Sequence, residues 1–153
     1  MTSVSFYHLT ATPLERALPK LLEKILSAGF KVALLAEEAR LEPLNQLLWS
    51  YDPDSFLPHG TLADGDAARQ PVLLIHQLSD WPQENSEAKS LLFITSGAKA
   101  EGPFERVVDM FDGRDETALD SARARWKDYK NAGHTLSYYQ QTENGSWQQK
   151  AAS

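Results

Sequence analysis

The spacing of apolar residues changes from one segment of the chain to the next, and each spacing predicts a type of element. Residues 4–9, VSFYHL, are rich in β-forming side chains, which predicts a strand. After it, apolar residues recur at the spacing of a single helix face until Gly29 ends the pattern. The residues with this helical spacing are Leu14, Leu18, Leu21, Leu22, Ile25 and Leu26.

Local signals around this first helix conflict with one another. Thr12, Pro13 and Glu15 predict a capping box with proline at the first helical position. Pro19 argues against a straight helix, because proline removes one backbone hydrogen bond and clashes one turn back. We expect a kink at Pro19, or a first turn that is separate from the main helix.

Four further segments are almost continuously apolar, as in strands that are buried on both faces of a parallel sheet. They are KVALLA at 31–36, PVLLIHQL at 71–78, SLLFITS at 90–96 and ERVVDMF at 105–111. A second helix is predicted between the first two segments. It starts near Pro43, or earlier near Glu37, and includes LNQLLW at 44–49.

The last third of the chain predicts a long helix and a hairpin. Residues 115–134 read as a helix closed by Gly133. Two β-rich runs then flank Asn144-Gly145, a dipeptide that suits a type I′ turn. The alternation of strands and helices predicts a single α/β domain over residues 1–150, with a mixed, mostly parallel sheet and helices on both faces. Its topology would be nucleotide-binding-like with a C-terminal β-hairpin, and residues 151–153 would be a frayed tail.

Composition narrows the class of protein. The 153 residues include no cysteine and carry a formal net charge of −6. Without cysteine there is neither a disulfide framework nor thiolate chemistry, which fits a cytoplasmic location. We expect no signal peptide and no membrane contact, since no segment approaches the roughly 20 apolar residues of a membrane span. An acidic chain is also a poor candidate for wrapping a phosphate backbone, unless its basic residues are clustered.

Motifs for cofactors and catalysis are weak. No glycine-rich phosphate loop follows the first strand, and SGAKAEG at 96–102 has the wrong spacing for one. The four histidines lack ligand-type neighbours at metal spacing. We therefore expect no catalytic residue, cofactor or metal. A hydrolase built on Ser55 and His59 is a less favoured alternative, because nothing marks Ser55 as a nucleophile.

One helical segment stands apart in charge. Residues 121–131, SARARWKDYKN, hold four basic residues and one acidic residue. At 100° per residue, one narrow face carries Arg123, Trp126, Lys127 and Lys130. This basic stripe is either a solvated face or an anion site with an aromatic wall. As an anion site it suits a short acidic peptide better than a duplex, because it spans too few phosphates.

Large rings also occur where the chain predicts a loop. LWSYDPDSFLPHG at 48–60 contains a breaker run, yet it also carries Trp49, Phe56 and His59. Aromatic side chains in such a loop suit interface anchors. Alternatively, they pack in the core at the helix end. We expect Trp49 to be core and Phe56 to be at least partly exposed in an interface.

These segments together resemble the chi subunit of bacterial DNA polymerase III, a clamp-loader accessory protein. The resemblance covers nearly the whole chain and is carried by FYHL at 6–9, LW…SFLPHG at 48–60, QPVLL at 70–74, RVVDMFD at 106–112 and AR.RWK.YK.AGH.L.YYQQ at 122–141. It implies a protein without catalytic activity of its own, with an α/β fold that lacks a phosphate loop. It implies a role in DNA replication, in which the protein binds the acidic, phenylalanine-ended C-terminal tail of the single-stranded-DNA-binding protein. A psi subunit, or another protein on the face that carries Phe56, would be a second partner, and contact with single-stranded DNA would be indirect.

The resemblance also implies roles for particular residues. The family's tail-binding arginine, aromatic and lysine fall on Arg123, Trp126 and Lys127, and Phe111 is the best match for the apolar pocket beside them. A basic position one turn upstream is Leu119 or Asp120 here, so Lys130 is the candidate to supply that charge. On the partner face, the matching residues are Trp49, Phe56 and His59. Direct nucleic-acid binding through residues 123–130 remains an alternative use of the stripe.

Overall fold

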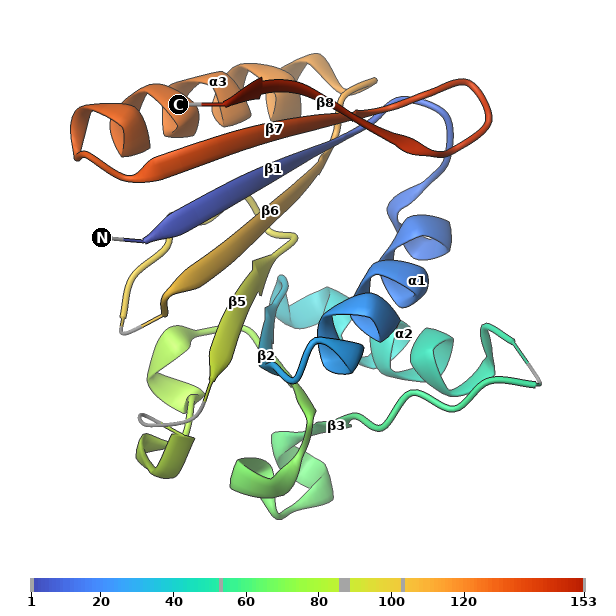
Figure 1. The fold of residues 1–153 in the computed structure, drawn as a ribbon. Helices are drawn as coiled ribbons and strands as arrows, with labels where there is room; N and C mark the ends of the chain where they lie inside the picture. The colour runs from blue at the N-terminus through green and yellow to red at the C-terminus, as the bar shows by residue number, and fades with distance from the viewer. Residues whose placement is uncertain (1, 53, 86–88, 103, 153) are drawn as a thin grey trace.

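The computed structural model describes residues 2–52, 54–85, 89–102 and 104–152. They form a sheet of eight strands in the order β3-β4-β2-β5-β6-β1-β7-β8 (Figure 1). Among the described strands, neighbours run parallel except for β7 and β8. The mixed, mostly parallel α/β architecture is therefore confirmed. Its strands are β1 (Ser3–Leu9), β2 (Lys31–Leu35), β3 (Gly60–Thr61), β4 (Val72–Ile75), β5 (Ser90–Ile94), β6 (Arg106–Asp112), β7 (Thr135–Gln141) and β8 (Trp147–Ala152).

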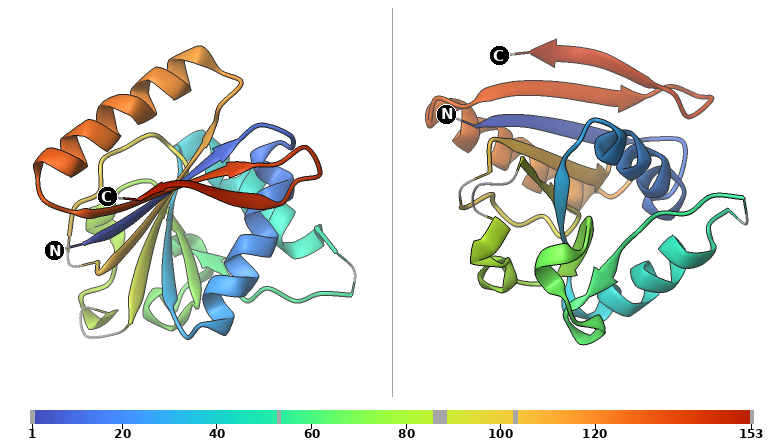
Figure 2. Two further views of the ribbon diagram at one scale, coloured as in Figure 1. Left: turned by 45° about the horizontal axis from the view of Figure 1, so that its top comes forward. Right: turned by 60° about the horizontal axis from the view of Figure 1, so that its bottom comes forward.

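Helices cover both faces of the sheet. The helices α1 (Leu14–Ser27) and α2 (Glu38–Ser50) lie on one face, and α3 (Glu116–Asn131) lies on the other (Figures 1 and 2). Alternate residues of each strand serve the two faces, so that in β2 Val32 and Leu34 pack with α1 and α2. Ala33 and Leu35 belong to the core beneath α3. Double-sided burial explains why these strands read as continuous apolar runs.

The first helix lacks its predicted capping box, and of the two alternatives at Pro19 the structure excludes the separate first turn. Pro13 is its N-cap and no side chain caps the helix, so the capping box from Thr12 does not form. Thr12 instead bonds Gln141, whose side-chain oxygen accepts the Thr12 backbone N–H at 3.1 Å and whose amide donates to the Thr12 hydroxyl at 2.7 Å. The helix also runs from Leu14 to Ser27 with Pro19 inside it, so there is no separate first turn.

The second helix takes the earlier of its two predicted starts. It begins at Glu38, and Pro43 lies within it. The two-residue strand β3 was not predicted. It pairs with β4 and brings the chain back to the sheet after the aromatic loop. No helix in the described part of the chain is long and apolar enough to cross a membrane.

The C-terminal hairpin is present, but its turn is not type I′. A type I′ turn needs positive φ at both central residues. Only Gly145 meets this condition, with φ of 87°, because Asn144 is not among the residues with positive φ. The loop spans three residues, and its ends are joined by a Thr142 N–H bond to the Ser146 carbonyl at 2.7 Å. The strand β8 then pairs with β7 as far as Ala152, through most of the segment that the sequence predicts to fray.

Candidate functional site

The basic stripe lies on α3, whose ends are set by local signals. The Asp115 carboxylate caps the helix by accepting the N–H groups of Thr117 at 2.9 Å and Ala118 at 3.3 Å. Gly133, with φ of 87°, follows the last turn. The helix packs on the sheet through Ala122, Arg125 and Tyr129, which are all buried. The stripe residues Arg123, Lys127 and Lys130 face solvent, and Trp126 lies at the boundary.

Arg125 was counted among the basic residues of this helix, but it is buried against the sheet. Its guanidinium donates two hydrogen bonds to Asp109 of β6, at 2.7 and 3.0 Å, and a third to the Ser121 hydroxyl at 2.6 Å. Burial raises the pKa of the Asp109 carboxyl, and the two hydrogen bonds from Arg125 oppose that rise. This pair fixes α3 against β6. A lone aspartate inside the apolar run RVVDMF was the signal that a buried cation would face it.

A pocket of about 260 Å³ opens between α3 and the sheet beside the stripe. We call it the Trp126 pocket, and its lining residues are Phe111, Leu119, Ala122, Arg123, Trp126 and Tyr138. The structure thus brings together three of the predicted site residues, Phe111, Arg123 and Trp126. Lys127 and Lys130 are exposed on the same helix but do not line the pocket. Leu119 adds to the apolar wall of the pocket.

Edge-to-face aromatic contacts hold the walls of this pocket. The Trp126 ring lies 5.4 Å from Phe6 and 5.8 Å from Tyr138, in both cases nearly perpendicular. Phe6 in turn contacts Phe111 at 6.3 Å. Such geometry is favoured between aromatic rings and adds to the gain from burial. The pocket is therefore formed before any ligand arrives.

Two polar groups lie behind the pocket. The side chain of His8 forms a hydrogen bond with the Tyr138 hydroxyl, and its ring packs 5.1 Å from Phe111. Burial, and next the positive charge of Arg123, lower the pKa of His8 below its ordinary value of 6.5. Gly113 is required beside it, because a Cβ at that position would come within 1.7 Å of the His8 ring.

The charges at the rim of the pocket are mostly free to meet a ligand. The Arg123 side chain is 71% exposed and lies 3.6 Å from Asp120, a contact of the weak surface kind. The Asp128 carboxylate forms an ion pair with Lys99 at 2.6 Å, on the far side of the stripe. The exposed cations Lys127 and Lys130 form no ion pair with any residue that the structure describes. An anion at the pocket rim therefore meets a cationic surface.

The aromatic loop forms a second, separate surface, which we call the Phe56 face. Phe56 is 73% exposed, as predicted. Trp49 is 53% exposed, so the expectation that it packs in the core is wrong. The two rings lie 6.1 Å apart. Trp49 sits at the end of α2 on the side away from Leu44 and Leu48, which take the core positions.

His59 belongs to the support of this face rather than to its surface. It is only 4% exposed, and Trp49 packs on its ring at 4.5 Å. Its two ring nitrogens lie at 2.7 Å from the Leu57 carbonyl and 3.1 Å from the Asn45 carbonyl. Ser55 bonds Asp52 instead. Because neither nitrogen of His59 is directed at Ser55, the pair is not arranged as a base and a nucleophile.

The usual ligand position of an α/β sheet lies outside the carboxyl ends of its parallel strands. A crevice of about 410 Å³ lies there. Its lining includes four acids, Glu15, Glu37, Asp112 and Asp115, and three arginines, Arg40, Arg114 and Arg125, each of which already pairs with a carboxylate. The N–H groups at the start of α3 that could receive a phosphate are taken by Asp115. This crevice therefore disfavours a nucleotide. The described residues contain no group of three metal-ligating side chains.

Comparison with known proteins identifies the family. Residues 1–137 match the family model described as the DNA polymerase III chi subunit. The chain is 31% identical over 113 residues to DNA polymerase III subunit chi of Escherichia coli, covering 71% of this chain and 73% of that protein. It is 32% identical over 97 residues to a probable DNA polymerase III subunit chi of Rickettsia prowazekii, covering 63% of this chain. The match spans only 56% of the length of the Rickettsia protein. Residues 138–153, which hold most of the hairpin, lie beyond the family match. Because the match covers most of the chain, the chain belongs to the DNA polymerase III chi subunit family.

Proposed function

We propose that this protein is a non-catalytic accessory subunit of DNA polymerase III that binds the acidic C-terminal tail of the single-stranded-DNA-binding protein in the Trp126 pocket. Its role in replication is supported by the family and by the names of its relatives. The tail-binding role is supported by one observation above all. An apolar pocket with a guanidinium at its rim occurs in a chain whose net charge is −6.

The pocket and the stripe match the two chemical parts of such a tail. The terminal phenylalanine ring enters between Phe111 and Trp126, where aromatic walls are already in place. The terminal carboxylate is adjacent to that ring in the peptide, and it pairs with Arg123. The aspartates upstream meet Lys127 and then Lys130, which lie one and two turns beyond Arg123 on the same face.

The magnitudes indicate which part contributes more to affinity. Ion pairs at an exposed rim are typically worth under about 1 kcal/mol each. Full burial of a phenylalanine side chain gains roughly 1.5–3 kcal/mol. The ring therefore provides much of the affinity, and the charges orient the peptide and speed its encounter. Binding weakens with added salt but persists at moderate ionic strength, because its apolar part is not screened.

The Phe56 face is the second part of the proposal. Two exposed rings at 6.1 Å from each other, backed by the buried His59, form an apolar surface suited to a protein partner. We assign it to a psi subunit or another clamp-loader protein. The chain then bridges the clamp loader and the single-stranded-DNA-binding protein in the cytoplasm, and its contact with single-stranded DNA through these two surfaces is indirect.

Calorimetric titration with a synthetic tail peptide tests the tail-binding role. Arg123→Ala and Trp126→Ala should each weaken binding, and a peptide without its terminal phenylalanine should lose more affinity than one without a single aspartate. Arg69→Ala is the matched control, since Arg69 is also an exposed arginine but lies between β3 and β4. If Arg123→Ala and Trp126→Ala both bind the peptide as well as wild type does, the tail binds elsewhere.

A further inference from the structure

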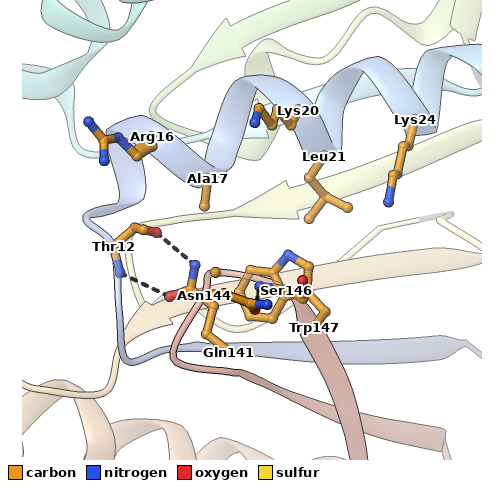
Figure 3. Close-up of a pocket in the computed structure, with 11 residues that line it drawn as sticks. Thr12, Arg16, Ala17, Lys20, Leu21, Lys24, Gln141, Asn144, Ser146 and Trp147 are labelled. Atoms are coloured by element: carbon orange, nitrogen blue, oxygen red, sulfur yellow. Dashed lines mark hydrogen bonds between the residues drawn. The ribbon is translucent and has the colours of Figure 1, made fainter.

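A second basic surface lies in a cleft on the opposite face of the sheet from the Trp126 pocket. The cleft, of about 580 Å³, separates α1 from the C-terminal hairpin, and we call it the α1–hairpin cleft. In Figure 3, Leu21 and Lys24 reach from α1 toward the hairpin, and Asn144, Ser146 and Trp147 lie on the opposite side. Most of the hairpin lies beyond the residues that match the family.

Three cations form a row along the helical wall of the cleft. Arg16, Lys20 and Lys24 are exposed, all line the cleft, and stand four residues apart, which places each about 6 Å from the next along the axis. None of the three forms an ion pair with a residue in the described ranges. The row is therefore available to an external anion.

The acids of α1 do not neutralise this row. Glu15 pairs with Arg40 of α2 at 2.6 Å, and Glu23 accepts a hydrogen bond from the Tyr51 hydroxyl. No carboxylate is among the residues that line the cleft. Arg16 and Lys20 also border the groove toward α2, where Glu15 and Glu23 lie, whereas Lys24 reaches toward the hairpin (Figure 3).

The hairpin wall supplies an aromatic ring that is fixed in place. Trp147 is half-buried and stacks on Tyr7 of β1, with ring centres 5.0 Å apart and planes 28° apart. Gln141 ties the hairpin to the loop before α1, because its side-chain oxygen accepts the backbone N–H groups of Thr10, Ala11 and Thr12. The cleft is therefore set by hydrogen bonds and stacking within the fold, and needs no ligand to form.

We propose that the α1–hairpin cleft binds single-stranded nucleic acid, with successive phosphates on Arg16, Lys20 and Lys24 and a base against Trp147. Sites for single strands combine a basic track for the backbone with an aromatic platform for the bases. The spacing of the three cations is comparable to that of neighbouring phosphates in an extended strand. A cleft of this volume accommodates a base and its sugar.

Other anions fit the cleft less well. An acidic peptide that ends in an aromatic residue needs an enclosed apolar pocket beside the cations, as in the Trp126 pocket. Here the hairpin side of the cleft is polar at Asn144 and Ser146. A duplex is too broad for a row of about 12 Å inside a concave surface.

The salt dependence of binding follows from the number of cations. Each phosphate neutralised on a single strand contributes about −0.7 to the slope of log affinity against log salt concentration, so three contribute about −2. A fourfold rise in salt concentration should therefore weaken binding roughly 20-fold. This slope distinguishes an ordered row of three contacts from a single adventitious contact.

The test is a fluorescence anisotropy titration of a fluorescein-labelled oligothymidylate at low salt concentration. The variant Arg16→Gln/Lys20→Gln/Lys24→Gln changes only exposed residues and should bind at least about tenfold more weakly, with a flattened salt slope. The matched control is Arg123→Gln/Lys127→Gln/Lys130→Gln, which removes the same three charges from the basic stripe of α3. It should bind the oligonucleotide nearly as well as wild type does.

The aromatic wall is tested separately. Trp147→Leu should weaken binding by roughly 5- to 150-fold, the range for loss of one base-stacking ring. Trp147→Phe keeps a ring on Tyr7 and should retain most of the affinity. If the leucine variant disturbs the hairpin, as thermal melting would reveal, the charge variants still decide the question.

Three results would each overturn the proposal. They are no binding of the oligonucleotide by wild type, an equal loss in the two triple variants, and equal or tighter binding of a labelled polyglutamate peptide that also requires the α1 cations. None of these results bears on tail binding, because the Trp126 pocket shares no residue with the cleft.

Discussion

The Trp126 pocket and the Phe56 face are both aromatic, but they are built in opposite ways. In the pocket, rings from β1, β6, β7 and α3 lock one another edge to face, and a buried ion pair holds α3 to the sheet. On the Phe56 face, the two rings project from the end of α2 and the loop that follows it. A preformed concave site suits a flexible peptide, because little of the protein has to be ordered on binding. Two projecting rings suit a folded partner that brings its own pocket.

Charge separates the two regions as well. Arg123 stands at the rim of the pocket, whereas Asp52 and Asp54 precede Phe56 in its loop. An acidic peptide is therefore attracted to the first region and repelled from the second. We expect the two surfaces to recognise different partners and to be occupied at the same time, since they lie on opposite faces of the sheet.

The largest expected effect concerns the ion pair that holds the pocket together. Arg125→Met should lower the free energy of unfolding by about 3–5 kcal/mol, because Asp109 remains buried without a partner. The double variant Asp109→Leu/Arg125→Met removes both charges and should recover much of that loss. Urea denaturation measures both. Arg123→Met, on the exposed side of the same helix, is the control and should change stability by no more than about 0.5 kcal/mol. An equal cost for the two arginines would mean that the pair does not hold α3.

A gain of affinity would sharpen the charge comparison. Asp120 lies 3.6 Å from Arg123 and competes with any carboxylate at the pocket rim. Asp120→Lys removes that competitor and adds a cation, so tail-peptide affinity should rise roughly two- to tenfold, the range for one or two exposed ion pairs. Asp54→Lys makes the same change of charge on the Phe56 face. Calorimetry should show little gain for Asp54→Lys, and an equal gain would indicate attraction by net charge alone.

The sequence could predict the fold where the pattern is local and long. Continuous apolar runs of four or more residues identified β2, β4 and β5, because double-sided burial leaves no polar position in them. The strand β6 was recognised although Asp109 interrupts its apolar run. The strand β3 has only two residues, too few to carry a pattern. Thr12 looked like a helix cap, but Gln141, 129 residues away in sequence, takes its side chain. Such long-range competition for a polar group leaves no local signal.

The candidate site shows the same division. Helical spacing placed Arg123 and Trp126 on one face, and the resemblance supplied Phe111, which the structure brings beside them. Periodicity could not tell which arginine of α3 is buried, because that depends on Asp109 in a different element. The predictions for Trp49 and His59 failed for a similar reason: Trp49 was expected in the core and is exposed, whereas His59 was expected on the partner face and is buried. Whether a ring at a helix end is covered depends on where the following loop runs, and the loop covers His59 and leaves Trp49 open.

The His8 site behind the pocket gives stability a dependence on pH. Its pKa is lowered in the folded protein, chiefly by burial and then by Arg123, while Asp112 acts in the opposite direction. The unfolded chain therefore binds a proton more readily, and stability is lost as pH falls through the ordinary value of 6.5 toward the lower folded value. Urea denaturation across this interval should show the loss in wild type. His8→Gln keeps a polar partner for Tyr138 and should reduce the dependence, and an unchanged pH profile would show that other groups cause it.

The smallest expected effect on stability is at the Phe56 face, and it tests the comparison most directly. Phe56 keeps 73% of its surface exposed and Trp49 keeps 53%, so their rings contribute little to the core. Phe56→Ala and Trp49→Ala should each change the free energy of unfolding by no more than about 0.5 kcal/mol. Phe6→Ala, which truncates a ring that is 1% exposed beneath α3, is the reference and should cost about 3–5 kcal/mol. For the affinity of a partner that docks on this face, the ranking should be the opposite, with Phe56→Ala and Trp49→Ala costing more than Phe6→Ala. Truncating a central aromatic anchor typically costs about 2 kcal/mol or more of binding energy. Urea denaturation of the three variants decides the first part. If Phe56→Ala destabilises the protein as much as Phe6→Ala does, the exposed ring is part of the fold and the proposed interface loses its main support.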